Sequence, residues 1–339
     1  MFSEVPQVSL GTIFRTFVLP QRSDLHFRMP EGYFVIPTSS GKSAMHLVLE
    51  WLRHTGVLTS RMDEILVPQW MGAWVYKTMH SHGFPQILPT MRTKVIWVYH
   101  QYGFAQDMDA ILDFAHRHNC IVIEDCAHAL ESNYKGLRLG TIGDFGIFSF
   151  SKFLPSLMGG AIITKNQEAR DYFLNRIGAS RTLYAPFLFW SKYFDEYTHH
   201  APFAQELLKT SYSLYAYQTA MTRTVQNLIA RSLASLQSRK ENYTVVKRVL
   251  KGDEWTDSLD AHALPYVVPL RGSEEELSRI VAVIRDAQIY SGIYHFDKNQ
   301  NVLKPQWVKV AWLPIHQDIP AKIIGAVSAK IKNILKKST

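Results

Sequence analysis

The chain has 339 residues, of which 47% are hydrophobic and 19% are charged. This length and composition predict a globular protein with a large core, and they exclude a disordered chain or one small module. The net charge of +8 is scattered, and its one dense basic run, at 330–337, alternates with apolar residues as the solvated face of a final helix does. We therefore expect no nucleic-acid partner and no membrane partner.

Cysteine usage and the first residues indicate a cytoplasmic protein. The two cysteines, Cys120 and Cys126, flank an apolar run and form no short-spaced metal or redox motif. Such sparse cysteine usage is typical of a reducing compartment. Glu4 and Pro6 stand where a secretory signal would have a basic start and an apolar block. We expect no bound metal.

Strand-like and helix-like segments alternate through roughly the first two hundred residues. Short apolar runs predict strands, and amphipathic stretches between them predict helices. The predicted strands are residues 33–37, 65–68, 95–99, 120–124, 145–150 and 161–164, and the predicted helices include 43–54 and 107–118. This order predicts an α/β fold with a mainly parallel sheet covered by helices.

The pattern changes after about residue 170. Aromatic-rich helical segments come first, and a long linking helix is predicted at about 220–250. A β-α-β pattern follows, with a strand at 263–270, a helix at 273–288, a strand at 308–313 and a final helix from 320. We expect a large domain over residues 1–220 and a smaller C-terminal α/β domain over residues 221–339.

Small and polar residues precede the helix predicted at 43–54. The run Ser39-Ser40-Gly41-Lys42-Ser43 places backbone N–H groups at a helix start. The helix dipole and these unpaired donors favour an anion such as phosphate. A plain helix N-cap by Ser39 or Ser40 accounts for the same residues equally well.

Acidic residues end the most apolar predicted strand. Ile121-Val122-Ile123 leads into Glu124 and Asp125, and His128 follows three residues later. Open α/β sheets bind ligands at the carboxyl ends of their strands. A carboxylate there can keep the nitrogen of a bound pyridine ring protonated. The alternative interpretation is a helix N-cap with a structural histidine.

Lys152 is the only charged residue between positions 145 and 164. This segment is long enough to span a bilayer, but its serines, Pro155 and the Gly159-Gly160 pair favour protein interior. A lysine in such a run is costly unless it has a chemical task. Apolar surroundings favour the uncharged amine that a Schiff base with pyridoxal phosphate requires. The alternative is a lysine in a surface loop.

Two tryptophans follow the strand predicted at 65–68. Trp70 and Trp74 offer flat rings that could stack on a bound heterocycle. Core packing is the commoner use of such residues.

Residues 95–160 resemble the DegT/DnrJ/StrS family of sugar aminotransferases. These are pyridoxal-phosphate enzymes of fold type I, in the aspartate aminotransferase superfamily, and they act mainly on nucleotide-linked keto sugars. The similarity is carried by His100-Gln101-Tyr102-Gly103, Asp107-Met108-Asp109, Val122-Ile123-Glu124-Asp125-Cys126-Ala127-His128, Gly143-Asp144-Phe145-Gly146, Phe148-Ser149-Phe150, Lys152 and Gly159-Gly160, and more weakly by Ser40-Gly41 and Leu313-Pro314-Ile315-His316.

The resemblance implies a role for each candidate residue. Lys152 would hold pyridoxal phosphate as a Schiff base, Asp125 would pair with the pyridine nitrogen, and His128 would lie near the phenolic oxygen. Ser40, Gly41 and either Ser149 or Ser151 would hold the phosphate. From the residues themselves we add Lys42, next to Gly41, and Trp70, for its flat ring, to the candidate cofactor contacts. The reaction would be transamination from an amino acid, by analogy glutamate, to a keto sugar. A homodimer would form, in which the partner chain completes each site.

Three departures from the family pattern leave details open. Only Ser151 separates the Phe-Ser-Phe run from the lysine, where the family has three residues. Lys42 stands where threonine is common. The family's Asn and Arg-Met pattern is missing around residues 212–223. The partner-chain contact and the acceptor are therefore not predicted.

Other function classes are weaker. Gly41-Lys42-Ser43 after a strand is similar to a P-loop, but the full motif needs glycine five residues before Gly41, where Ile36 stands. A dehydratase of this fold would have histidine in place of Lys152. Another reaction that depends on pyridoxal phosphate, or a catalytically idle protein of this fold, is an alternative that Asp125, His128 and Lys152 together disfavour.

Overall fold

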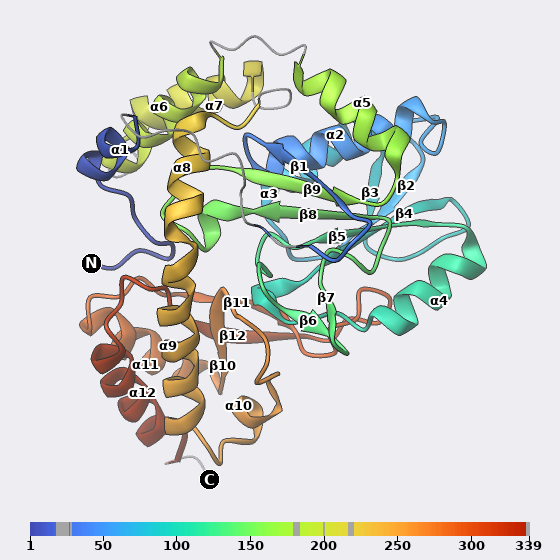
Figure 1. Ribbon diagram of the computed structural model, residues 1–339. Helices are drawn as coiled ribbons and strands as arrows, with labels where there is room; N and C mark the ends of the chain where they lie inside the picture. The colour runs from blue at the N-terminus through green and yellow to red at the C-terminus, as the bar shows by residue number, and fades with distance from the viewer. Residues whose placement is uncertain (18–26, 28, 179–183, 199–200, 216–219, 337–339) are drawn as a thin grey trace.

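The structure is a computed structural model that describes residues 1–17, 27, 29–178, 184–198, 201–215 and 220–336. Figure 1 shows a large sheet with flanking helices and, below it, a smaller sheet with helices of its own. The helices α8 and α9 run from the level of the first sheet down to the second.

The large sheet has seven strands in the order β1-β9-β8-β5-β4-β2-β3. Strands β3, β2, β4, β5 and β8 are parallel to one another, whereas β9 is antiparallel to both β8 and β1. The predicted mainly parallel sheet is confirmed. Its strands are β1 (Phe34–Thr38), β2 (Glu64–Leu66), β3 (Phe84–Gln86), β4 (Thr93–Tyr99), β5 (Ile121–Asp125), β8 (Phe145–Ser149) and β9 (Gly160–Thr164).

Helices cover both faces of this sheet because its central strands are apolar on both sides. Val95 and Trp97 of β4 pack in one core cluster with α2 (Gly41–His54) and α5 (Gln167–Gly178). Ile96 and Val98, which alternate with them, pack in another cluster with α4 (Met108–His118). The remaining helices of this part include α1 (Leu10–Phe17) and α3 (Ala73–His80).

Two short elements were not predicted. The strand β3 has three residues, one of them Pro85, and the β6–β7 ribbon (Asn133–Tyr134 and Leu137–Arg138) has two residues in each strand. Runs this short carry no readable period of alternating side chains.

The helix predicted at about 220–250 is interrupted. Helix α8 (Arg223–Ser232) starts at an N-cap, Thr222, and α9 (Leu236–Val249) follows a 3-10 turn. The hydroxyls of Ser232 and Ser235 donate to the carbonyls of Leu228 and Ser232, at 2.7 and 2.6 Å, beside this break. Such bonds compete with the regular helical pattern. Before α8 lie α6 (Tyr184–Tyr197) and α7 (Pro202–Tyr215), which pack on each other.

The smaller sheet is antiparallel, in the order β10-β12-β11. The predicted β-α-β pattern implies that the strand at 308–313 runs parallel to the strand at 263–270. This is wrong, because the two strands are antiparallel. The strand that runs parallel to β10 (Val267–Arg271) after α11 (Glu274–Asp286) is β11 (Ile293–Asp297), and β12 (Trp307–Pro314) lies between the two. Sequence inspection missed β11 because only its last two residues are buried. The other helices here are α10 (Glu254–Ser258) and α12 (Ala321–Leu335).

The first residues lie against the C-terminal part of the chain. Phe2 forms a parallel bridge with Ile289, donating its N–H to the carbonyl of Gln288 and accepting from the N–H of Tyr290 at 2.6 and 2.8 Å. Residues 1–220 thus do not pack only among themselves, because Phe2 pairs with residues of the C-terminal part. The domain division at about residue 220 stays a prediction.

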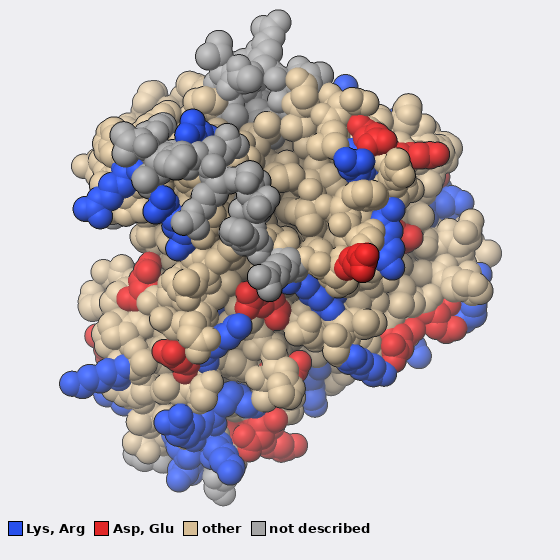
Figure 2. Space-filling view, viewed as in Figure 1, with Lys and Arg blue, Asp and Glu red and all other residues tan. Residues whose placement is uncertain are grey.

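The apolar segment at 145–164 forms β8, a turn and β9 inside the large sheet. Among the described helices, none combines the length and the apolar character needed to cross a bilayer. On the face drawn in Figure 2, basic and acidic side chains are interspersed, with the densest group of lysines and arginines over the lower part.

We predict that Gly160→Ala destabilises the protein. A Cβ at this position would meet backbone atoms of Ser40 and Gly41 at 2.4 to 2.6 Å, and backbone cannot move aside as a flexible side chain can. Overpacking of this kind costs about 1–3 kcal/mol, which urea unfolding would measure. Gly178→Ala is the matched control, because none of the described residues lies within 4 Å of its new Cβ. Equal stability of the two variants would contradict the close approach.

Candidate active site

The carboxyl ends of three neighbouring strands and the start of α2 meet at one edge of the large sheet. Tyr99 of β4 is opposite Asp125 of β5, and Asp125 is opposite Ile147 of β8. At the next position along the sheet edge, Ser149 is opposite Gly160, and Ser40 forms a bridge with Gly159. Residues that are far apart in the sequence are therefore brought together where open α/β sheets bind ligands.

A cavity of about 910 Å³ opens at this edge. It contains six of the predicted site residues, which come from the start of α2 and from the turn after β8: Ser40, Gly41, Lys42, Ser149, Ser151 and Lys152. Residues 1–8, Trp74 of α3, Lys192 and Glu196 of α6 and Tyr266 complete much of its wall. Its volume suits a cofactor together with a small substrate.

The start of α2 has the features of an anion site. Ser40 caps the helix, with its hydroxyl accepting from the N–H of Ser43 at 3.2 Å. Gly41 lies so close to β8 that a Cβ there would approach the Cβ of Ser149 at 3.1 Å. The buried hydroxyl of Ser43 has no hydrogen-bond partner among the described residues. Hydroxyls and helix-start N–H groups on a cavity wall suit a phosphate.

Lys152 ends a 3-10 turn, Phe150–Lys152, and it is half-buried on the cavity wall. Its Nζ lies 5.2 Å from the centre of the Tyr266 ring. The flanking Phe150 and Phe153 are fully buried, so this turn is anchored in the core and the lysine is not a loose surface side chain. Packing on both sides thus holds the amine on the same wall as the helix-start anion site.

Asp125 is 7% exposed and is not among the residues that line the cavity. Its two carboxylate oxygens accept from Trp97 Nε1 at 3.1 Å and from the N–H of Ala127 at 3.0 Å. Burial raises the pKa of this carboxyl, and the hydrogen bonds and the charge of Lys152 oppose the rise. A protonated ring nitrogen beside Asp125 would supply the positive charge that the buried carboxylate lacks.

The surroundings of His128 favour its neutral form. Burial holds its pKa well below the usual value, and the positive charges of Lys152 and Arg239 lower it further. Its Nδ1 is 2.7 Å from the Tyr99 hydroxyl, and its ring stacks on Tyr266 with centres 4.1 Å apart. A neutral, oriented imidazole can hold a proton near an oxygen of a bound ligand.

Arg239 and Tyr266 belong to the site, although sequence inspection did not find them. Arg239, on α9, is fully buried and donates to the carbonyls of Tyr266 at 3.0 Å and of Lys152 at 3.4 Å. Burial lowers the pKa of its guanidinium to about 9. Neither residue lies in a motif, and both reach the site only through the packing of distant segments.

Trp70 is placed away from the cavity wall. Its ring stacks on His295 of β11, with centres 3.8 Å apart and planes 9° from parallel. Trp74 lines the cavity instead, where the Nζ of Lys42 lies 4.6 Å from the centre of its ring. The structure therefore brings the second of the two candidate tryptophans to the site.

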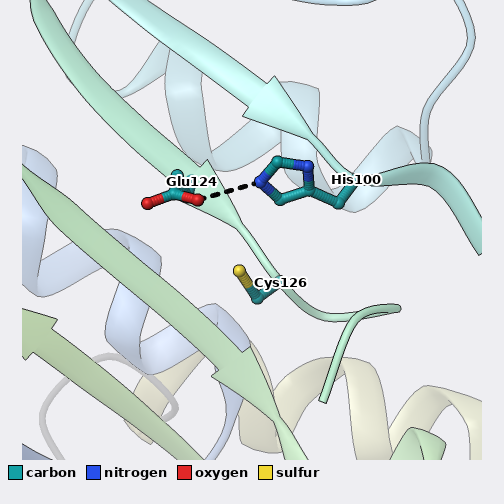
Figure 3. A group of neighbouring side chains, drawn as sticks. All are labelled: His100, Glu124 and Cys126. Carbon is teal, nitrogen blue, oxygen red and sulfur yellow. Dashed lines mark hydrogen bonds and ion pairs between the residues drawn. The ribbon is translucent and has the colours of Figure 1, made fainter. Parts of the chain in front are cut away.

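A buried group of possible metal ligands lies at the carboxyl end of β5. Figure 3 shows His100 and Glu124 facing each other, with Cys126 beside them. His100 Nε2 is 3.1 Å from Glu124, while its Nδ1 accepts from the N–H of Gln106. Glu124 also accepts from the N–H groups of Gly140, Ile142 and Gly143 at 2.7 to 2.8 Å. These hydrogen bonds explain why His100 and Glu124 lie together: the two residues belong to a network that holds the loop before β8.

The sequence of residues 88–304 matches the profile of the DegT/DnrJ/EryC1/StrS aminotransferase family. The chain belongs to this family. The match covers the strands β4 to β11, including the turn that carries Lys152, and it confirms the family resemblance of the sequence.

Curated relatives match this member of the family over shorter segments. It is 43% identical over 102 residues to a putative L-glutamine:3-amino-2,3-dideoxy-scyllo-inosose aminotransferase from Micromonospora echinospora, covering 29% of this chain and 24% of the relative. It is 35% identical over 153 residues to the L-glutamine:2-deoxy-scyllo-inosose aminotransferase of Streptomyces lividus, covering 39% and 35%. The matched segments thus span about a quarter to a third of these relatives.

Solved structures show the same fold over nearly the whole chain. A putative sugar aminotransferase from Streptococcus pneumoniae, Spr1654 in its PMP form, aligns with a TM-score of 0.66 at 16% identity, covering 99% of both chains. Helicobacter pylori PseC, an aminotransferase, aligns with a TM-score of 0.65 at 13% identity, covering 98% of both chains. These matches confirm the predicted fold type I architecture.

We predict that Glu124→Gln destabilises the fold. The amide NH₂ of glutamine would face N–H donors that now point at a carboxylate, and losing charged hydrogen bonds costs about 1.5–3 kcal/mol each. Urea unfolding would measure the loss. The exposed Glu31→Gln is the matched control and should unfold as the wild type does. If both variants were equally stable, the network would not hold the loop.

Proposed function

We propose that this protein is a pyridoxal-phosphate-dependent aminotransferase that transfers an amino group from an amino acid to a keto sugar. One observation carries the proposal: the Lys152 amine and the helix-start anion site of α2 lie on the wall of the same cavity. Family membership and the names of the similar sugar aminotransferases support it.

The described residues fit the cofactor. Ser40, Gly41 and Lys42 would hold its phosphate, together with Ser149 or Ser151 from the neighbouring end of β8 and the turn after it. Asp125 would pair with the ring nitrogen and His128 would lie near the phenolic oxygen. When bound, pyridoxal phosphate supplies an aldehyde that carries the amino group and a ring that accepts electron density.

The residues of the chain would do the proton chemistry. The Lys152 amine would act as general base and acid, moving the proton between the Cα of the amino donor and the C4′ carbon of the cofactor. Its place above the Tyr266 ring keeps it at the cavity wall. Asp125 would hold the ring nitrogen in its protonated form, so that developing charge meets a fixed counterion.

Donor, acceptor, assembly and compartment are finer parts of the same proposal. The names of both curated relatives specify L-glutamine, so we propose glutamine or glutamate as the donor. As the acceptor we propose a keto sugar, including nucleotide-linked ones. A homodimer is proposed from the family resemblance. The family's Asn and Arg-Met pattern is missing around residues 212–223, and within this region residues 216–219 lie outside the described residues. Both cysteines are free and buried, which suits a cytoplasmic protein.

We predict that the purified protein is yellow and that borohydride bleaches it while fixing the cofactor covalently on Lys152. Peptide mass spectrometry would locate the label, and Lys152→Ala should not acquire it. A label on another lysine, such as Lys42, or no label at all, would refute the proposal.

We predict that Asp125→Asn lowers kcat about a hundredfold to a thousandfold, the usual cost of losing one preorganised electrostatic partner. The cofactor should be retained, because Lys152 and the phosphate site remain. Steady-state kinetics and the absorbance of bound cofactor would test both points. Asp113→Asn is the control, since Asp113 is an exposed partner of Arg117 on α4. An unchanged kcat for Asp125→Asn would show that this carboxylate does not stabilise the electron-rich state.

A further inference from the structure

Helix α6 contributes a lysine to the cavity that no family motif identifies. Lys192 lines the wall together with Glu196, one turn later on the same helix. The two side chains form an ion pair at 2.5 Å, and each is only about one-fifth exposed, at 22% and 19%. A lysine and its counterion are therefore held at the ligand cavity and not out in solvent.

The position of Lys192 is set by the core. The neighbouring Leu188 and Phe189 are buried in the largest core cluster, with at most 2% exposure. The hydroxyl of Ser211 on α7 donates to that of Ser191 at 2.9 Å in the buried interface of the two helices. Figure 1 shows α6 and α7 side by side above the end of the sheet. These contacts fix the part of α6 from which Lys192 extends.

Three lysines share this cavity, and their charges affect one another. Lys42 lies in the first turn of α2, and its pKa falls to about 8 because of burial first, then the charge of Lys192, then that of Lys152. Lys192 thus affects Lys42 more strongly than Lys152 does. Lys192 therefore lies within electrostatic range of Lys42, which starts α2 on the same cavity wall. Crowded ammonium groups are unfavourable unless an anion lies between them.

We propose that Lys192 and Lys42 form a two-lysine clamp on the phosphate dianion of the cofactor, with Lys192 reaching it from α6. This inference rests on the proposed function and extends it, because α6 lies outside the strand-end segments that carry the family resemblance. Glu196 neutralises Lys192 while the phosphate is absent. Phosphate binding must therefore compete with Glu196 for the same ammonium group.

The clamp predicts opposite effects for two neighbouring variants. Lys192→Met should raise the Kd for pyridoxal phosphate about tenfold to a hundredfold, the range for one charged hydrogen bond. Its Kd for pyridoxal, which lacks the phosphate, should stay within about twofold of the wild type, because the removed ammonium would contact only the phosphate. Glu196→Gln should lower the Kd for pyridoxal phosphate several-fold, because the competing carboxylate is removed. Titration of the apoprotein, followed by absorbance and intrinsic fluorescence, measures these constants without turnover.

Two control variants test whether the effect depends on the position and the charge of Lys192. Lys209→Met removes a similar lysine, paired with Glu206 on the neighbouring helix α7 and not on the cavity wall, and should leave both constants unchanged. Lys192→Arg keeps the charge and should bind pyridoxal phosphate within about threefold of the wild type. If Lys192→Met does not fold, the Kd values of Lys192→Arg and Glu196→Gln for pyridoxal phosphate still test the clamp.

The clamp is refuted if Lys192→Met binds pyridoxal phosphate as the wild type does, if it loses pyridoxal equally, or if Glu196→Gln does not tighten binding. A loss confined to the KM for L-glutamine or L-glutamate would assign Lys192 to the carboxylate of the donor and also refute the clamp. A wild-type protein that does not bind pyridoxal phosphate at all would instead refute the proposed function.

Discussion

The turn before α2 and the turn after Lys152 are joined through their backbones, and the candidate site depends on this contact. The N–H of Gly159 donates to the carbonyl of Ser39 at 2.8 Å, and the carbonyl of Gly159 accepts from Phe150 at 2.9 Å. Gly159 has a φ of 111°, a conformation that residues with a Cβ rarely adopt. One glycine thereby couples the start of α2 to the turn that carries Lys152.

The C-terminal part of the chain also supports the site, through Arg239 of α9. Arg239 is fully buried yet carries a charge that carbonyl oxygens and aromatic faces surround, including the Phe153 ring at 4.7 Å from its guanidinium carbon. Its donors connect α9, the segment leading to β10 and the Lys152 turn. Its Nε has no hydrogen-bond partner among the described residues, so the buried cation is stabilised by the donors that reach these carbonyls and by the aromatic rings. The placement of Lys152 is thus tied to how the C-terminal part of the chain packs.

Sequence reasoning found what is local and missed what depends on packing. The predicted strands 120–124 and 145–150 and the predicted helix from 43 lie within one or two residues of the observed ends at Asp125 and Ser149 and the observed start at Gly41, because period, capping residues and glycines mark these positions locally. Tyr266, Arg239 and Lys192 lie in no motif and come from segments over a hundred residues away from Ser40. Tyr266 and Lys192 line the cavity, and Arg239 donates to the Lys152 turn beside it. Trp70 was predicted as the cofactor contact, whereas Trp74 lines the cavity. The stacking of Trp70 on His295 of β11 could not be foreseen, because β11 itself was missed.

Strand β5 ends in two carboxylates with separate tasks. Successive side chains of a strand point to opposite faces, so Glu124 enters the loop network while Asp125 turns towards Trp97 and the ligand edge. The two acids are chemically alike, and only the register of the strand distinguishes them. Inserting or deleting a single residue upstream in β5 would exchange their directions. A change of length within this strand would therefore disturb both the loop network and the ligand edge, whereas a substitution would alter one side chain at a time.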